Sequence, residues 1–214
     1  MLSQIWPLFG LRLRVRDVEL RLPTDEELCT LARLAAEGIH PSATMPFEVP
    51  WTDVPSPRQE RNSLQFHWRC RADWQRDSWD LPLMVWAGGM PVGSQGMKAA
   101  EFSFRREVAT GSWLGREFQG RGIGKLMRTA VLHLAFVGLG AQHAVTSAFD
   151  DNAASLGVTR SLGYQADGVK RKVVRDRVVT AQRFRITRDA WLARDHPPVE
   201  VEGLEGCLEL FGAD

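Results

Sequence analysis

A glycine-punctuated turn that opens an amphipathic helix is the feature that most constrains this chain. A strand is expected to end at Leu114, and Gly120, Gly122 and Gly124 then alternate with other residues before the helix begins. From residue 123 onward, apolar side chains recur every three or four positions, which is the spacing of a helix with one buried face. The first amides of a helix have no partner within it and lie at the positive end of its dipole. The turn therefore predicts a site that binds phosphate.

The spacing of the glycines excludes the two common nucleotide motifs. A P-loop needs a Lys followed by Ser or Thr after its last glycine, whereas Lys125 is followed by Leu126. A dinucleotide fingerprint needs Gly-x-Gly-x-x-Gly, whereas residues 120–124 read Gly-x-Gly-x-Gly. The phosphate ligand must therefore be of another kind.

The segment Gln119-Gly-Arg-Gly122-Ile-Gly124 resembles the acyl-CoA pyrophosphate loop of the GNAT N-acyltransferases, whose pattern is Gln/Arg-x-x-Gly-x-Gly/Ala. A second segment, about thirty residues further on, supports the resemblance. There Asn152-Ala-Ala-Ser155 and Gly163-Tyr164 are similar to the family's Asn-x-x-Ala/Ser helix that ends in Gly-Phe/Tyr. Together the two segments imply a protein that binds acyl-CoA.

Two branches of the family are similar in further positions. The strand end Gly111 to Leu114, with Ser155, resembles the ribosomal-protein N-terminal alanine and serine acetyltransferases. The Met-Pro-Phe segment at Met45 and the Pro-Trp segment at Trp51 resemble a bacterial subgroup that can use succinyl-CoA. The co-substrate implied is acetyl-CoA or succinyl-CoA, with no metal.

The order of the expected elements agrees with that of the GNAT fold. From Val18 to Trp191 we expect a strand, a helix, a hairpin, a long strand, the glycine-rich loop, a helix, a strand, a helix and terminal strands. Thr24 and Glu27 have the form of a capping box for the first helix. The predicted fold class is α/β (α+β), a GNAT-like mixed, mostly antiparallel sheet of six to seven strands flanked by helices, in a single domain. Residues 1–16 would be an N-terminal extension, 17–193 the GNAT domain and 194–214 an acidic C-terminal tail.

The resemblance also implies which residues hold the acyl donor. The turn would bind the pyrophosphate, the strand end would pair with the pantetheine arm, and one amide there would polarise the thioester carbonyl. The expected cofactor-binding residues are Trp113, Leu114, Gln119, Gly120, Arg121, Gly122, Ile123, Gly124, Lys125, Asn152 and Ser155.

A long apolar, proline-rich loop from His40 to Pro57 is expected to shape the acceptor pocket. Its candidate substrate-binding residues are Met45, Phe47 and Trp51. A loop that packs only on its own core would fit this composition equally well.

Catalysis in this family is implied to be direct attack of an unprotonated amine on the thioester. Many members carry a Tyr seven residues after the Asn as the acid for the departing thiolate, but this chain has Thr159 there. Ser155 becomes the candidate for that contact, with a role limited to its own helix as the alternative. Glu101 and Glu107, on or beside the strand that enters the loop, are the candidate bases, although solvated glutamates are common on strands.

The function that follows is an N-acyltransferase acting on a primary amine, which is a protein N-terminus, a lysine or a small amine. The alternative is a non-catalytic acyl-CoA-binding sensor or structural subunit of the same fold. Turnover of acyl-CoA, compared with binding alone, separates the two.

Composition sets the remaining expectations. Lys and Arg number 27 against 26 Asp and Glu, so bulk charge does not predict nucleic-acid or membrane binding. Cys29, Cys70 and Cys207 form no close pair, which favours a reducing cytoplasm. No secretory signal is recognised at the N-terminus, and no apolar run approaches the roughly 20 residues of a membrane span.

Local charge is less even than the total. Residues 168–188 are strongly basic, whereas residues 195–214 contain Asp and Glu but no Lys or Arg. The two stretches could pair within the chain or across a homodimer or higher oligomer, or both could be solvated. An RNA or ribosome binder that uses the basic stretch is a third hypothesis, which the scarcity of aromatics in that stretch disfavours.

Overall fold

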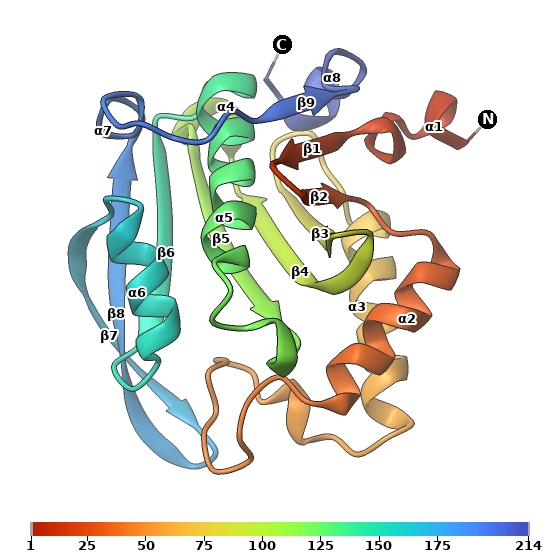
Figure 1. Cartoon of the computed structure of the whole chain (residues 1–214). Helices are drawn as coiled ribbons and strands as arrows, with labels where there is room; N and C mark the ends of the chain where they lie inside the picture. The colour runs from red at the N-terminus through yellow and green to blue at the C-terminus, as the bar shows by residue number, and fades with distance from the viewer. Residues whose placement is uncertain (1, 214) are drawn as a thin grey trace.

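One nine-stranded sheet, in the order β7-β8-β6-β5-β4-β3-β2-β1-β9, organises the chain in this computed structural model, which describes residues 2–213 (Figure 1). The strands are β1 (Arg12–Val15), β2 (Val18–Arg21), β3 (Trp79–Ala87), β4 (Met90–Ala99), β5 (Glu107–Leu114), β6 (His143–Phe149), β7 (Gln165–Val174), β8 (Arg177–Thr187) and β9 (Glu200–Glu202). The main helices are α2 (Asp25–Glu37), α3 (Arg58–Ala72), α5 (Ile123–His133) and α6 (Ala153–Ser161). Shorter helices are α1 (Leu2–Ile5), α4 (Phe102–Arg105), α7 (Arg188–Leu192) and α8 (Leu208–Phe211).

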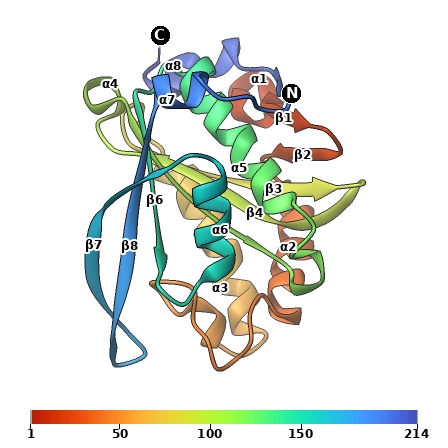
Figure 2. The same ribbon diagram turned by 60° about the vertical axis from the view of Figure 1, so that its left-hand side comes forward.

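Helices cover both faces of this sheet. Figures 1 and 2 show α5 and α6 over one face and α2 with α3 over the other. The apolar side of α5 is fully buried through Met127, Ala130 and Val131, which belong to the main core. On the other face, Leu28 and Leu31 of α2 form a smaller apolar cluster with side chains of the sheet.

The sheet divides between β5 and β6, its one parallel pair. Their pairing runs only from Glu107, opposite His143, to Ala109, opposite Val145. Beyond these residues β5 stays paired with β4, whereas β6 stays paired with β8. The two strands therefore diverge, and each leaves one edge of its backbone without a partner strand.

The sequence-based fold class is confirmed: the sheet is mixed and mostly antiparallel, and helices flank it. The capping box is also confirmed, because the Thr24 hydroxyl accepts from the Glu27 amide and the Glu27 carboxylate accepts from the Thr24 amide. The expected strand count of six to seven was too low, since β1 and β9 are short and charged and were not recognised. No helix among residues 2–213 has the length and apolar character needed to cross a membrane.

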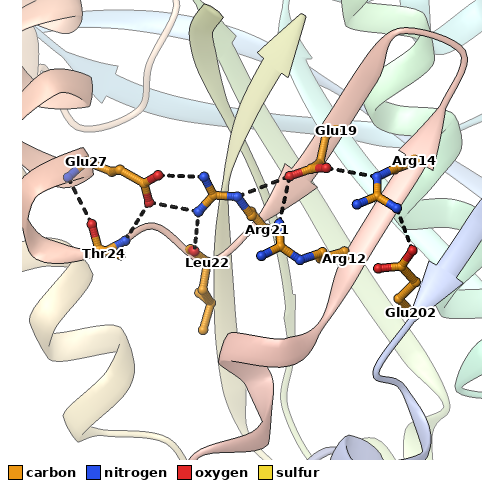
Figure 3. A network of polar contacts seen from close by, with 8 residues as sticks. All are labelled: Arg12, Arg14, Glu19, Arg21, Leu22, Thr24, Glu27 and Glu202. Atoms are coloured by element: carbon orange, nitrogen blue, oxygen red, sulfur yellow. Dashed lines mark hydrogen bonds and ion pairs between the residues drawn. The ribbon is translucent and has the colours of Figure 1, made fainter. Parts of the chain in front are cut away.

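The two expected end segments are part of the sheet rather than separate from it. Residues 1–16 contribute β1, and residues 194–214 contribute β9, which pairs with β1. Figure 3 shows the polar network along this edge, in which Arg14 joins Glu202 of β9 to Glu19 of β2. The acidic tail thus meets Arg14, and no ion pair among residues 2–213 joins it to the basic stretch at 168–188.

Glu19 is the centre of that network. Its carboxylate accepts hydrogen bonds from Arg12, Arg14 and Arg21 at 2.9 to 3.1 Å. Burial acts to raise the pKa of Glu19, but the Arg14 hydrogen bond and the three guanidinium charges outweigh it and leave that pKa lowered. The ionised carboxylate therefore stabilises the fold above its unfolded pKa of 4.5, and this stability is lost as the pH falls further.

Replacing Glu19 by Gln should lower the free energy of unfolding by roughly 1 kcal/mol at pH 7, because three cations lose their shared anion. Urea melts of both proteins at several pH values measure this. The difference should shrink as the pH falls well below 4.5, where the wild-type carboxylate is also neutral. A difference that stays constant with pH would show that the charge of Glu19 is not the cause.

Candidate active site

The glycine-rich turn presents bare backbone amides at the start of α5. Gly120 and Gly122 have φ values of 73° and 82°, a conformation that favours glycine. No side chain caps the helix, and its first internal hydrogen bonds run from Lys125 and Leu126 to the Gly122 carbonyl. The amides of residues 120–124 have no acceptor within the described part of the chain. They are available to an anion.

Space for that anion lies directly over the turn. A β-carbon built on Gly120 or Gly122 would meet no atom within 4 Å. Arg121 and Lys125 add positive charge beside the turn. The residues therefore fit a diphosphate, which needs open backbone and positive potential.

Gln119 shapes the turn from within. Its side-chain amide donates to the carbonyls of Ile39, at 2.7 Å, and Leu114, at 2.9 Å. The side chain thus ties the loop to the end of α2 and to β5. The sequence predicted that Gln119 contacts the cofactor. Because its side-chain NH₂ group is already used within the protein, such a contact would be made by its backbone or its side-chain oxygen.

The diverging strands lie beside the turn. From residue 110 to Leu114, one edge of β5 is paired with β4 and the other faces the gap toward β6. Backbone groups of Trp113 and Leu114 at this edge can receive an extended arm as an added strand. The predicted positions thus lie where an arm leaving the turn would run.

A cavity of about 1060 Å³ opens on the α3 side of the same gap. Its floor is formed by β4 and β5, where Gly96 and Gly111 are register partners. Phe47 and Trp51 line it, in ring contact with each other at 5.2 Å between centroids, and Trp51 also contacts Trp113 at 5.9 Å. Residues of the proline-rich loop therefore line this cavity, and the role of the loop in shaping an acceptor pocket stays a prediction.

Met45 does not line the cavity. It is buried in a separate apolar cluster with Phe149, Val174 and Ala181. It anchors the loop to the β7–β8 hairpin, which two ion pairs reinforce, Lys172 with Glu48 and Arg175 with Asp53. The predicted role of Met45 in substrate binding is therefore replaced by a role in loop packing.

Comparison with known proteins agrees with this geometry. Residues 17–165 match the family described as Acetyltransferase (GNAT) domain. The chain belongs to the GNAT acetyltransferase family.

Solved GNAT structures share its fold. RimJ of Mycobacterium smegmatis, in complex with CoA-disulfide, aligns over 92% of this chain and 91% of its own, with a TM-score of 0.68 and 17% identity. RimL, a ribosomal L7/L12 alpha-N-protein acetyltransferase in complex with coenzyme A, aligns over 84% of this chain and 99% of its own, with a TM-score of 0.67 and 17% identity. An acetyl transferase of Salmonella typhimurium that modifies the N-terminal serine of L7/L12 aligns over 80% of this chain and 95% of its own, with a TM-score of 0.66 and 17% identity.

The second GNAT-like segment of the sequence forms α6, and Asn152 is the N-cap of this helix. Its side-chain oxygen accepts from the Ser155 amide at 3.1 Å, which leaves its side-chain NH₂ group free to donate. Ser155 is partly exposed at the first turn, whereas Thr159 is fully buried beneath it. The hydroxyl of Thr159 accepts from Arg128 at 3.3 Å and so does not reach solvent.

The two predicted bases differ in place. Glu101 is exposed, with 72% of its side-chain surface free, and does not line the cavity. Glu107 does line it, but one carboxylate oxygen accepts from Arg105 at 3.3 Å and the other from Arg185 at 2.6 Å. Neither geometry suits a proton acceptor for an incoming amine, because one carboxylate is remote and the other is occupied.

Sequence reasoning missed Asp80, a third carboxylate in the cavity lining. Asp80 of β3 is opposite Lys98 of β4, which is opposite Ala109 of β5, so the three form one row that leads to the gap. Burial raises the pKa of Asp80, and Lys98 opposes that effect only in part. The sequence signal for Asp80 was an acidic residue inside an otherwise apolar strand. Which residues lie opposite Asp80 depends on the strand register, which the sequence does not show.

Another cavity residue is fixed in its neutral form. Burial, reinforced by the charge of Arg71, lowers the pKa of His67 to about 4. The imidazole is therefore uncharged near pH 7 and too weak a base to deprotonate an ammonium group.

Replacing Gly122 by Ala should weaken CoA binding by about tenfold or more, because the added methyl group projects into the anion space. Gly140→Ala is the matched control. Gly140 follows the far end of the same helical segment, its φ is 69°, and a β-carbon built on it would also meet no atom within 4 Å. Isothermal titration with CoA measures both variants. Equal affinities of the two variants for CoA would contradict the assignment of the turn.

Proposed function

We propose that this protein transfers an acetyl or succinyl group from acyl-CoA to a primary amine by direct attack. The observation that carries the proposal is that the open amide cradle follows the end of β5 that has lost β6 as its neighbour, and that the same end of β5 lines a large cavity. The acyl donor would be held by residues 120–125, the β5 edge and Asn152. The acceptor would enter from the α3 side.

The cavity reaches through the gap. Thr110 and Ser112 of β5 alternate with Ala109 and Gly111, so their side chains lie on the α5 side of the sheet. Both nevertheless line the cavity, together with Thr146 of β6. An amine on one side of the sheet can therefore meet a thioester held on the other, and no covalent intermediate with the protein is needed.

Asp80 is the residue best placed to take the proton of the ammonium group. It is two strands from Ala109, about 10 Å at the usual strand spacing, so the transfer would pass through water. A raised pKa brings a carboxylate closer to the range in which a base is effective. Asp80 replaces Glu101 and Glu107 in this role.

The acceptor is proposed to be a protein N-terminus, a lysine or a small amine. Support for a protein acceptor comes from the RimL neighbours, whose described substrate is a ribosomal protein. The proline-rich loop and the cavity volume leave room for several residues of an extended peptide.

A non-catalytic acyl-CoA sensor is the second candidate. The buried hydroxyl of Thr159 favours it, because no acid is available at that position for the departing thiolate. The two candidates predict the same CoA binding and differ in turnover.

Thiol release from acetyl-CoA and from succinyl-CoA, with a panel of amines and amino-terminal peptides, tests the proposal. We expect acceptor-dependent release with at least one donor. Tight binding of CoA without release for any acceptor would favour the sensor. Absence of both binding and release would exclude both candidates.

Replacing Asp80 by Asn should lower kcat by about 100-fold and remove the acidic limb of the pH profile of kcat/KM. Glu48→Gln, which removes another cavity carboxylate, should keep that limb. Because the pKa of Asp80 is raised in the fold, the native state binds the proton more tightly than the unfolded state does. The contribution of Asp80 to stability should therefore fall as the pH rises from 3.8 through its raised pKa, and the Asn variant should be at least as stable as the wild type at pH 7. A wild-type limb that persists in the Asn variant would exclude Asp80 as the base.

A further inference from the structure

A buried cation without an anionic partner lies beneath the gap between β5 and β6. Arg128 is in the second turn of α5, and only 3% of its surface is exposed. No ion pair joins it to a carboxylate in the described part of the chain. An arginine keeps its charge at any physiological pH, so this cation is held in the protein interior without compensation.

Three hydroxyls take the place of a carboxylate. The guanidinium donates to Ser112 of β5 at 3.1 Å, to Thr146 of β6 at 3.4 Å and to Thr159 of α6 at 3.3 Å. Its Nε has no acceptor among residues 2–213. Neutral oxygens satisfy the hydrogen bonds of a cation but leave its field unbalanced, and that field acts on any charge nearby.

Arg128 lies at the point where the strands part. The last paired residues are Ala109 and Val145, and the Thr146 hydroxyl donates to the carbonyl of Thr110 one residue further on. The guanidinium thus bonds to both strands just where the cavity passes between them. Its neighbours Ser112 and Thr146 line that cavity.

The direction of the hydroxyl protons distinguishes the two neighbours. Thr146 accepts from Arg128 and already donates to Thr110. Ser112 also accepts from Arg128, but its own proton has no acceptor among residues 2–213. That proton is free to be donated into the gap, and the cation behind the oxygen makes it a stronger donor.

We propose that Ser112 donates a hydrogen bond to the thioester sulfur of acyl-CoA and that Arg128 is the positioning residue that orients and polarises this hydroxyl. The inference rests on the proposed function. As the amine nitrogen bonds to the carbonyl carbon, the carbon–sulfur bond breaks and its electron pair stays on sulfur. The base has already taken the ammonium proton of the amine before the attack. The second proton, which the nitrogen loses on becoming an amide, passes through water to the thiolate, and the Ser112 hydrogen bond and the Arg128 charge stabilise the thiolate until then. Ser112 keeps its own proton.

This assignment gives the contact with the departing sulfur to β5 rather than to α6. Thr159, which is buried against the guanidinium, is one of the residues that hold Arg128 in place. Burial also raises the pKa of Tyr164, whose charge would act on Arg128, so its phenol stays neutral and does not compensate the guanidinium.

The pKa of the CoA thiol in its complex with the protein is the direct test, followed by the ultraviolet absorbance of the thiolate. In the wild type this pKa should lie below that of free CoA. Ser112→Ala and Arg128→Met should each raise it by about 1 to 3. Both should lower kcat by about tenfold or more, with a smaller change in the affinity for CoA. Arg128→Lys, which keeps the charge, should retain most of the effect on the thiol and covers the case in which the Met variant does not fold.

Ser161→Ala and Arg160→Met on α6 are the matched controls, because they remove an exposed hydroxyl and an exposed cation from the neighbouring helix. Neither should change the thiol pKa. The proposal is overturned if the thiol titrates alike in the wild type, Ser112→Ala and Arg128→Met, or if only Ser155→Ala raises its pKa. It is also overturned if Arg128→Met loses turnover of succinyl-CoA alone, since Arg128 would then bind the acyl carboxylate. These outcomes differ from a failure of the proposed function, in which the wild type itself shows no turnover.

Discussion

The early end of pairing between β5 and β6 is the constraint on which the rest of the structure depends. Three residues on each strand are paired, and beyond them both backbones continue without each other. Unpaired backbone groups inside a protein are costly unless a partner satisfies them. A gap of this kind is stable because β4 and β8 hold the outer edges of the two strands and because α5 and α6 cover it on one face.

The position of α5 follows from the same gap. Because β5 leads through one short 3-10 helix, Arg116–Phe118, into the glycine-rich turn, the free amides of the helix start lie beyond the end of β5 that has lost its neighbour. The proposed phosphate site and the strand edge are therefore neighbours by chain connectivity. A ligand with an anionic group, an amide-bearing arm and a reactive end can use all three regions at once: turn, edge and cavity.

Two charged groups in and near this gap have incomplete charge compensation. Arg128 is buried among hydroxyls beneath the gap, and Asp80, two strands away, is partly buried with one partly compensating lysine. An uncompensated buried charge destabilises a fold by several kcal/mol relative to a well-packed apolar residue. Groups of this kind cluster at functional sites, which supports the site proposed above.

Local sequence signals predicted the local structure well. The glycine alternation at 120–124 predicted the open turn, the Thr24–Glu27 pair predicted a helix start, and Asn152 predicted the N-terminus of α6. These features depend on a few neighbouring residues, so the sequence alone can show them.

Features that depend on distant residues were not predictable in the same way. The sequence suggested that Glu107 is a free carboxylate, but it accepts a hydrogen bond from Arg185, which is 78 positions away in the chain. The roles proposed for Asp80 and Ser112 depend on the register of neighbouring strands, and the role proposed for Arg128 depends on its contacts with three separate elements. Lys172 and Arg175 of the basic stretch pair with the proline-rich loop, and within residues 2–213 no ion pair joins the stretch to the acidic tail, because β9 joins the far edge of the sheet.

Backbone amide resonances of the protein during titration with CoA test the central claim most directly. The account predicts that the amides of residues 120–125 shift strongly and saturate together, with smaller shifts along Trp113 and Leu114. Amides of the basic β7–β8 hairpin should stay near their free positions. A titration that moves the hairpin and leaves residues 120–125 unchanged would contradict the account.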